Sequence, residues 1–182
     1  TTVQDYKTKQ MDGKQVYTPE EVEAQAKREF VAKDTGLMKK EFLYSAARKS
    51  DGVPLIETPL AHIDFDNLKA LNHAVGNPKA DQLFKKFSQT ISKYGFVGAR
   101  HGGDEFVLVL FDSPVKDSQL RTERLCAAIR GMQSGSHAEF GTITASAGIA
   151  QADVHAADSA ELLHAADRAL YAAKAAGGDC VV

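Results

Sequence analysis

Short apolar runs divide the chain into expected strands. They lie at residues 58–65, 96–100, 105–112, 140–150 and 181–182. The second and third runs are separated only by His101-Gly102-Gly103-Asp104. Two strands joined by so short a glycine-containing segment predict a β-hairpin with its turn at these residues.

Helical spacing of apolar residues occupies most of the remaining chain. The helices are expected at residues 18–34, 37–49, 68–75, 80–95, 118–132 and 159–178. Thr18 and Pro19 suit a helix start, and Gly36 suits the turn that follows. Strand, helical crossover, hairpin, helix and strand in this order match the split β-α-β arrangement. The sequence therefore predicts the α+β class, with a central antiparallel sheet wrapped by helices in a ferredoxin-like arrangement.

Length and composition favour one domain with an extension. We assign residues 1–30 to an N-terminal extension or linker helix and residues 31–182 to the domain. The 182 residues are 43% hydrophobic and 25% charged with a net charge of −2, so we expect no nucleic-acid partner. We also expect no membrane span, because the apolar runs are too short. Cys126 and Cys180 suit reduced thiols in the cytoplasm, and the initial Thr suggests a piece of a longer protein.

Two pairs of acids follow or begin expected strands. Asp64 and Asp66 are two residues apart, so their side chains share one side of an extended chain. Asp104 and Glu105 lie at the hairpin tip and are expected beside Asp64. Clustered carboxylates without His or Cys suit Mg²⁺ or Mn²⁺. Each motif alone is also typical of ordinary turns and strand ends.

The glycines of the hairpin add a second feature. Gly102 and Gly103 carry no side chain, so a ligand can approach the backbone closely there. Acids that suit a metal, beside open backbone for a bulky anion, indicate a nucleoside triphosphate with its Mg²⁺.

Five motifs in order resemble the GGDEF family of diguanylate cyclases. The signature is intact at residues 102–106 (GGDEF), and residues 64–81 resemble DxDxFKxxNDxxGHxxGD with four substitutions. Residues 33–42 are similar to a degenerate DxLTGLxNRRxF, and residues 143–150 and 165–174 resemble the family's last strand and helix. The resemblance covers about residues 30–182 and implies the palm fold of nucleotide cyclases.

The resemblance implies that two GTP molecules are joined into cyclic di-GMP with release of two pyrophosphates. One domain holds one GTP, so a homodimer is implied. Asp64 and Asp104 are expected to bind the metal through carboxylates, and Phe65 through its carbonyl. Glu105 is expected to assist loss of the 3′-OH proton, with Asp104 and Glu105 as the catalytic pair. The signal and its sensory domain are expected elsewhere in the full chain.

The resemblance also implies a substrate site. Asn72 and Asp81 are expected to read guanine, because a carboxylate accepts from N–H groups that adenine lacks. The phosphates are expected beside Gly103, on the backbone amides of Asn67, Leu68 and Lys69, and on the side chain of Lys174.

The match fails at two places. The family's GRN after the last helix is Gly177-Gly178-Asp179 here, which removes a cation and adds an acid. The product-binding RxxD is Lys93-Tyr94-Gly95-Phe96, where the Phe96 ring offers at most stacking on a base. His62 is expected to be a packed core residue.

Two other functions stay open at this stage. One is a catalytically weak or inactive GGDEF-like module that binds GTP or a partner protein. The other is a related palm-type nucleotide cyclase or polymerase. The presence of Asp64, Asp104, Glu105, Asn72 and Asp81 argues against the first, and Asn72 with Asp81 argues against an adenine-using enzyme.

Overall fold

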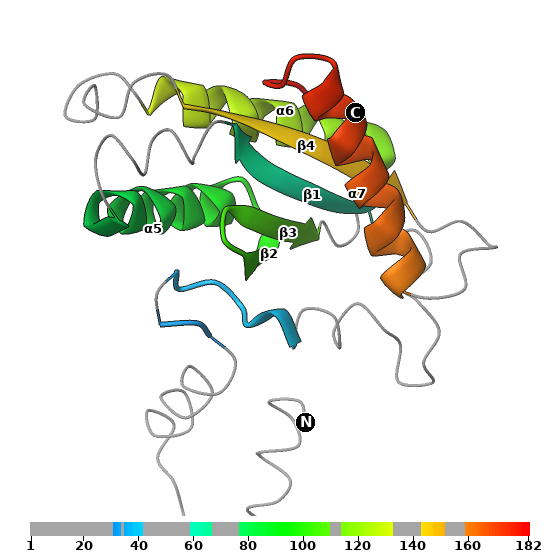
Figure 1. Cartoon of the computed structure of the whole chain (residues 1–182). Coiled ribbons are helices and arrows are strands. Elements are labelled where there is room, and N and C mark those ends of the chain that lie inside the picture. The colour runs from blue at the N-terminus through cyan, green and yellow to red at the C-terminus, as the bar shows by residue number, and fades with distance from the viewer. Residues whose placement is uncertain are drawn as a thin grey trace, which may run out of the picture.

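The computed structural model describes seven segments of the chain (Figure 1). They are residues 31–33, 35–41, 59–66, 77–109, 114–132, 143–151 and 159–182, without the side chains of 77–81 and 159. The elements are β1 (Pro59–Asp66), α5 (Asn77–Lys93), β2 (Val97–Gly102), β3 (Glu105–Val109), α6 (Val115–Gly131), β4 (Thr144–Gln151) and α7 (Ser159–Ala175). The helices expected at 18–34 and 68–75 lie largely or wholly outside the described residues, as does the extension 1–30.

The four strands form one antiparallel sheet in the order β2-β3-β1-β4. The predicted α+β class is thereby confirmed. Strand β1 is central, since it pairs with β3 on one side and β4 on the other. Seven of its eight residues are buried, and only the last, Asp66, is partly exposed. The residues of β1 are therefore held in place by backbone pairing with a strand on each side.

The two faces of the sheet have different coverings. Ala61, Ile63 and Phe65 of β1 pack into the larger core, to which α5 and α6 contribute. The Phe65 ring lies 4.8 Å from that of Phe87, and Phe87 lies 4.7 Å from Phe106, both edge to face. The alternate residues of β1 face α7, which crosses the sheet at β1 and β4 (Figure 1). The polar ends of Asp64 and Asp66 therefore lie on the α7 face.

Two details differ from the sequence prediction. Residues 37–39 are not helical, because Met38 forms a bridge with Ala99 and its N–H donates to the Gly98 carbonyl at 3.1 Å. The edge of β2 offers unpaired backbone groups, and this pairing satisfies some of them. The hairpin turn is also shorter than expected, since Gly102 still pairs with Glu105 and only Gly103 and Asp104 form the turn.

The end of the chain joins the edge of β4 through an isolated bridge, where the sequence predicted an edge strand. Val181 pairs in parallel with Ala147 of β4, and the Val182 N–H donates to the Ala147 carbonyl at 2.9 Å. None of the helices in the described ranges is long and apolar enough to cross a membrane.

Gly148 of β4 lies directly against the backbone of α7, so a substitution there tests how closely α7 packs on the sheet. A Cβ at this position would overlap the α7 backbone at Ala166 and Leu170. We expect Gly148→Ala to lower the free energy of unfolding by more than about 2 kcal/mol, because backbone cannot move aside as a side chain can. Urea unfolding followed by circular dichroism measures this.

Gly131→Ala is the matched control. Gly131 lies at the end of α6, and a Cβ there would meet nothing within 4 Å. Its stability should stay equal or rise by up to about 1 kcal/mol. Equal stability of the two variants would show that α7 does not rest on Gly148.

Candidate functional site

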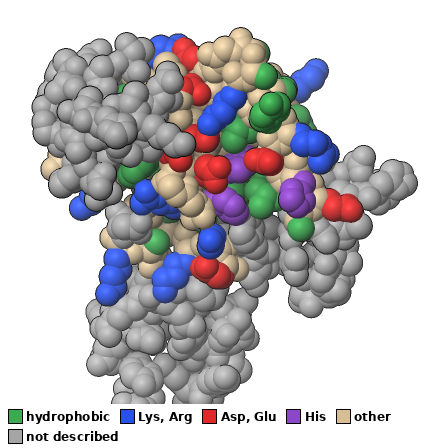
Figure 2. Space-filling model, viewed as in Figure 1, with side chains coloured by type: hydrophobic (Ala, Val, Ile, Leu, Met, Phe, Trp, Pro, Cys, Tyr) green, Lys and Arg blue, Asp and Glu red, His purple; other side chains and the backbone are tan. Residues whose placement is uncertain are grey.

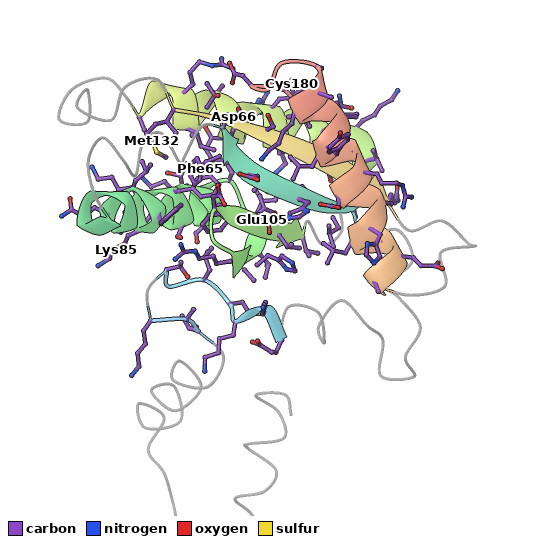
Figure 3. All side chains as sticks on the ribbon, viewed as in Figure 1. Phe65, Asp66, Lys85, Glu105, Met132 and Cys180 are labelled. Carbon is purple, nitrogen blue, oxygen red and sulfur yellow. The ribbon has the colours of Figure 1, made fainter. Side chains whose placement is uncertain are left out.

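The hairpin brings Glu105 directly opposite Asp64. The two residues are cross-strand partners in the β1–β3 ladder, so their side chains share the α7 face. Asp104 precedes Glu105 in the turn, after Gly103 with a φ of +42°. Figure 3 shows Glu105 on its strand beside β1, and Asp66 further along β1 toward the C-terminal end of the chain. Strand pairing thus brings Asp64 and Glu105 together, as the sequence predicted.

Asp64 is a buried carboxylate. The residue is 7% exposed, and its Oδ2 accepts an ion-paired hydrogen bond from Lys174 Nζ of α7. Burial raises the pKa of Asp64 above its ordinary value, and the negative charges of Asp104 and Glu105 act in the same direction. Lys174 opposes this shift by stabilising the ionised form.

The second oxygen of Asp64 is the feature that fits a metal. Asp64 Oδ1 is buried and has no hydrogen-bond partner among the described residues, and a buried carboxylate oxygen without a partner is costly. A hard divalent cation is a suitable partner for it, and the carboxylate of Asp104 would supply a further oxygen. The described residues nevertheless contain no group of three His, Cys, Asp or Glu side chains already arranged to hold a metal. Ligands from a bound nucleotide would therefore be needed to complete such a site.

Asp66 has a different role from Asp64. Its carboxylate accepts hydrogen bonds from Thr144 Oγ1 at 2.7 Å, Ser146 Oγ at 2.8 Å and the Asp179 N–H at 3.0 Å. These donors come from β4 and from the loop after α7. Asp66 therefore joins the end of β1 to the C-terminal loop. The DxD spacing drew attention to this residue, but nothing in the sequence indicated these partners.

The loop after α7 cannot hold an arginine in place of Gly178 as it stands. Gly177, Gly178 and Asp179 all have positive φ, at +117°, +78° and +57°. A Cβ at Gly178 would lie 3.1 Å from Asp66 Oδ1. The added acid, Asp179, is held by Arg130 of α6 in a two-pronged ion pair at 2.9 and 2.5 Å. Its negative charge is therefore matched by a local cation.

Arg100 supports the hairpin turn and was missed by the sequence analysis. Its Nε and Nη2 donate to the Gly103 carbonyl at 2.8 and 2.6 Å, and its guanidinium lies 4.3 Å from the centre of the Phe84 ring. This contact fixes the carbonyl that directly precedes Asp104. The position of Arg100 just before a glycine turn was the available signal.

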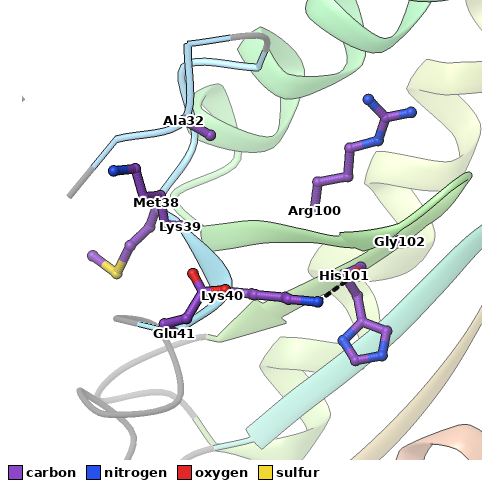
Figure 4. A pocket seen from close by; sticks show the side chains of 8 residues that line it. All are labelled: Ala32, Met38, Lys39, Lys40, Glu41, Arg100, His101 and Gly102. Carbon is purple, nitrogen blue, oxygen red and sulfur yellow. Dashed lines mark hydrogen bonds between the residues drawn. The ribbon is translucent and has the colours of Figure 1, made fainter. Parts of the chain in front are cut away.

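The outer edge of the hairpin is also braced. Lys40 Nζ donates to the His101 carbonyl at 3.4 Å, as Figure 4 shows. This contact borders a cavity of about 280 Å³ between the segment 38–41 and β2. The residues lining the cavity include Lys39, Lys40, Arg100, His101 and Gly102. The segment 38–41 thus contacts β2 at His101, directly before the glycines of the signature.

His62 is buried behind Asp64, as expected for a core residue. It is 3% exposed, and its Nδ1 lies 3.3 Å from Asp167 Oδ1 of α7. Burial lowers the pKa of His62, while Glu105 and Asp167 oppose that shift. Figure 2 shows acidic and histidine side chains gathered in the middle of this face of the molecule.

Residues 93–96, which replace the family's product-binding RxxD, contact the core and α6. Phe96 is 5% exposed and belongs to the main core, so its ring does not offer even the stacking surface that the sequence left possible. Arg121 of α6 donates through Nε and Nη2 to the Tyr94 carbonyl at 3.1 and 2.5 Å. The strand was predicted to begin at Phe96, but β2 begins one residue later, at Val97, and the residue pattern could not tell that the Phe96 ring points into the core.

Other predicted site residues are only partly described. Asn67, Leu68, Lys69 and Asn72 lie outside the described residues. Asp81 lies in α5, with its side chain not described. Their roles toward guanine and phosphate stay predictions.

The fold and the acidic site define an α+β domain with an acidic hairpin beside a central strand. The model of the family described as "Diguanylate cyclase, GGDEF domain" matches residues 45–180. The chain belongs to this family.

Two relatives with similar sequence are named diguanylate cyclases. Diguanylate cyclase DgcP of Escherichia coli (strain K12) is 33% identical over 118 residues, which is 63% of this chain and 35% of that protein. Diguanylate cyclase DgcP of Pseudomonas aeruginosa is 35% identical over 138 residues, 74% of this chain and 20% of that protein. The matches thus span about a third and a fifth of these relatives.

A solved structure shows the same fold. The GGDEF domain of DgcB from Caulobacter crescentus, in complex with c-di-GMP, aligns with a TM-score of 0.73 at 21% identity. The alignment covers 84% of this chain and 94% of that one. The predicted palm-type fold of the GGDEF family is thereby confirmed.

Asp64→Asn should stabilise the metal-free protein at neutral pH. Because the pKa of Asp64 is raised in the folded state, ionisation of Asp64 opposes folding. The gain should shrink as the pH falls through this raised pKa, and it should vanish below the ordinary value of 3.8, where the carboxyl is protonated in both states. Lys174 is 39% exposed and can return to solvent. Unfolding in urea with EDTA across the pH range measures the effect.

Asp117→Asn is the control for that experiment. Asp117 is an exposed acid in the first turn of α6, where a negative charge is mildly favourable. Its removal should cost about 0.3–1 kcal/mol at neutral pH. Destabilisation by Asp64→Asn of the same sign would show that the ion pair with Lys174 outweighs the burial of Asp64.

Proposed function

We propose that this domain is a diguanylate cyclase, which condenses two GTP into cyclic di-GMP and releases two pyrophosphates. The observation that carries the proposal is the buried Oδ1 of Asp64, which none of the described residues pairs with. It lies opposite Glu105 and close to Asp104 on the glycine turn of the family signature. This arrangement suits a nucleotide that arrives with its divalent cation.

The acids divide into two roles in this proposal. Asp64, Asp104 and the carbonyl of Phe65 would hold Mg²⁺ or Mn²⁺. When bound, the metal supplies positive charge that stabilises the α-phosphate and the leaving pyrophosphate. Glu105 accepts the proton of the 3′-hydroxyl as its oxygen forms the new bond to the α-phosphorus. The bond from that phosphorus to the pyrophosphate oxygen breaks, and the step occurs twice per product.

The substrate contacts follow from the family's motifs. Asn72 and Asp81 would read the guanine edge, which leaves an adenine with unmatched polar groups. The backbone amides of Asn67, Leu68 and Lys69, the open backbone at Gly103 and the ammonium of Lys174 would bind the phosphates. Lys174 already lies at the acidic cluster, which supports its part in this assignment.

Two copies of the domain are required by this chemistry. Each domain would hold one GTP, and the 3′-hydroxyl of each attacks the α-phosphate of the other. We therefore propose a homodimer that forms for catalysis in the cytoplasm. The activating signal would come from a sensory domain elsewhere in the full protein.

The direct test is incubation with GTP and Mg²⁺, followed by chromatography for cyclic di-GMP. We expect conversion of GTP, conversion of ATP at least about 100-fold slower because its edge leaves Asp81 unmatched, and no turnover by Asp104→Asn. Asp81→Ala should reduce the preference for GTP. Binding of GTP without conversion by the wild-type protein would instead indicate a non-catalytic GGDEF-like module.

Dependence on protein concentration tests the assembly. Because the two reacting groups lie on different domains, the rate should rise faster than linearly with protein concentration while the protein is mainly monomeric. The measurement is the specific activity across a 100-fold dilution series, with the association state followed by light scattering. Constant specific activity in a range where scattering reports monomers would contradict the two-domain reaction.

A further inference from the structure

Lys174 occupies one oxygen of the carboxylate that the proposed metal needs. Its Nζ pairs with Asp64 Oδ2, while Oδ1 of the same carboxylate has no partner in the segments that the structure describes. The side chain of Asp64 is 10% exposed and that of Lys174 is 39% exposed. The ammonium therefore reaches from the solvent side into a buried acidic cluster.

Only one of the two partners can move easily. Asp64 is fixed by pairing with Glu105 on one side and Ser146 on the other. Lys174 lies in the last turn of α7, on a flexible four-carbon stem, and its ammonium needs no fixed geometry. The seat of α7 on Gly148 does not involve this side chain. Lys174 can leave Asp64 without displacing the helix.

We propose that Lys174 and the divalent cation compete for Asp64, so that the metal binds firmly only when a nucleotide gives Lys174 phosphates as its new partner. The inference rests on the proposed function and adds the order of binding, in which firm metal binding requires the nucleotide. Two cations cannot share so small a space without strong repulsion. Metal alone must displace Lys174 and leave it unpaired, whereas a metal–nucleotide complex supplies both the metal's missing ligands and an anion for Lys174.

The proposal agrees with the incomplete state of the site. Within the described residues, no three metal-binding side chains are already arranged around one point. The cluster is instead supplied with an internal positive charge that partly offsets the burial of Asp64. Lys174 thus acts as a substitute cation in the nucleotide-free protein.

The test is the binding of Mn²⁺ to wild-type protein and to Lys174→Gln, followed by electron paramagnetic resonance of free Mn²⁺. Without nucleotide, we expect Lys174→Gln to bind Mn²⁺ about tenfold more tightly, because the competing cation is gone. With a non-hydrolysable GTP analogue, the same variant should bind the Mn²⁺–nucleotide complex about tenfold more weakly, because a phosphate contact is lost. The two effects have opposite signs, which general damage to the site does not produce.

Three further variants make the result specific. Lys174→Met keeps the chain length without the charge and should repeat both effects. Lys116→Gln removes an exposed lysine near the start of α6 and should change neither affinity. In the chain, α6 follows the last residue of β3, whereas the signature turn precedes the first. Adding Asp64→Asn to Lys174→Gln should abolish the gain, because the gained Mn²⁺ binds through Asp64. Circular dichroism melts confirm that each variant is folded.

The nucleotide-free comparison decides the inference. Equal or weaker Mn²⁺ binding by both Lys174 variants, or no binding up to millimolar Mn²⁺, would overturn it. Failure of the proposed function looks different: the wild-type protein would not bind the GTP analogue, while tighter nucleotide-free Mn²⁺ binding by Lys174→Gln would still support competition at Asp64.

Discussion

The burial of the Asp64 carboxylate is the constraint around which the site is built. A charge removed from water is costly unless it is paired, and within the described part of the chain Asp64 has a cation on one oxygen and no partner on the other. Strand pairing on both sides prevents β1 from turning the group outward. The neighbouring elements must therefore come to it: α7 delivers Lys174, and the hairpin delivers Glu105. The fold retains an unsatisfied acid where a ligand can satisfy it.

The two acids of β1 divide stability and function between them. Asp66 accepts three hydrogen bonds from β4 and the C-terminal loop, so it has little capacity left for a ligand. Asp64 has the reverse arrangement, with a free oxygen in a buried place. Because Asp66 is anchored, the strand end that carries Asp64 and Phe65 is held in place. Two residues in one short motif thus serve opposite purposes.

The sequence predicted the elements better than the contacts. Short apolar runs identified β1, the hairpin and β4, because a strand that is buried on both faces carries apolar residues along most of its length. The Lys174–Asp64 and Arg130–Asp179 pairs join residues 110 and 49 positions apart, and no local pattern encodes such pairs. The inward direction of Phe96 and the bridge at Met38 depend likewise on what the finished sheet leaves uncovered. The acidic residues of the site could be named in advance, but not which oxygen would remain unsatisfied.

The altered loop after α7 changes the charge balance of the site. Three successive residues with positive φ turn the chain so that its backbone, at Asp179, donates to Asp66. An arginine side chain at Gly178 would disturb that turn. The residues at this place therefore form a hydrogen-bonded turn instead of supplying the cation of the family motif. Arg130 neutralises Asp179, which keeps the loop from repelling an anion. In the proposed function, much of the attraction for phosphate at this end of α7 would then fall on Lys174. A cation with that task would have to leave Asp64, with which it pairs in this structure, when a nucleotide arrives.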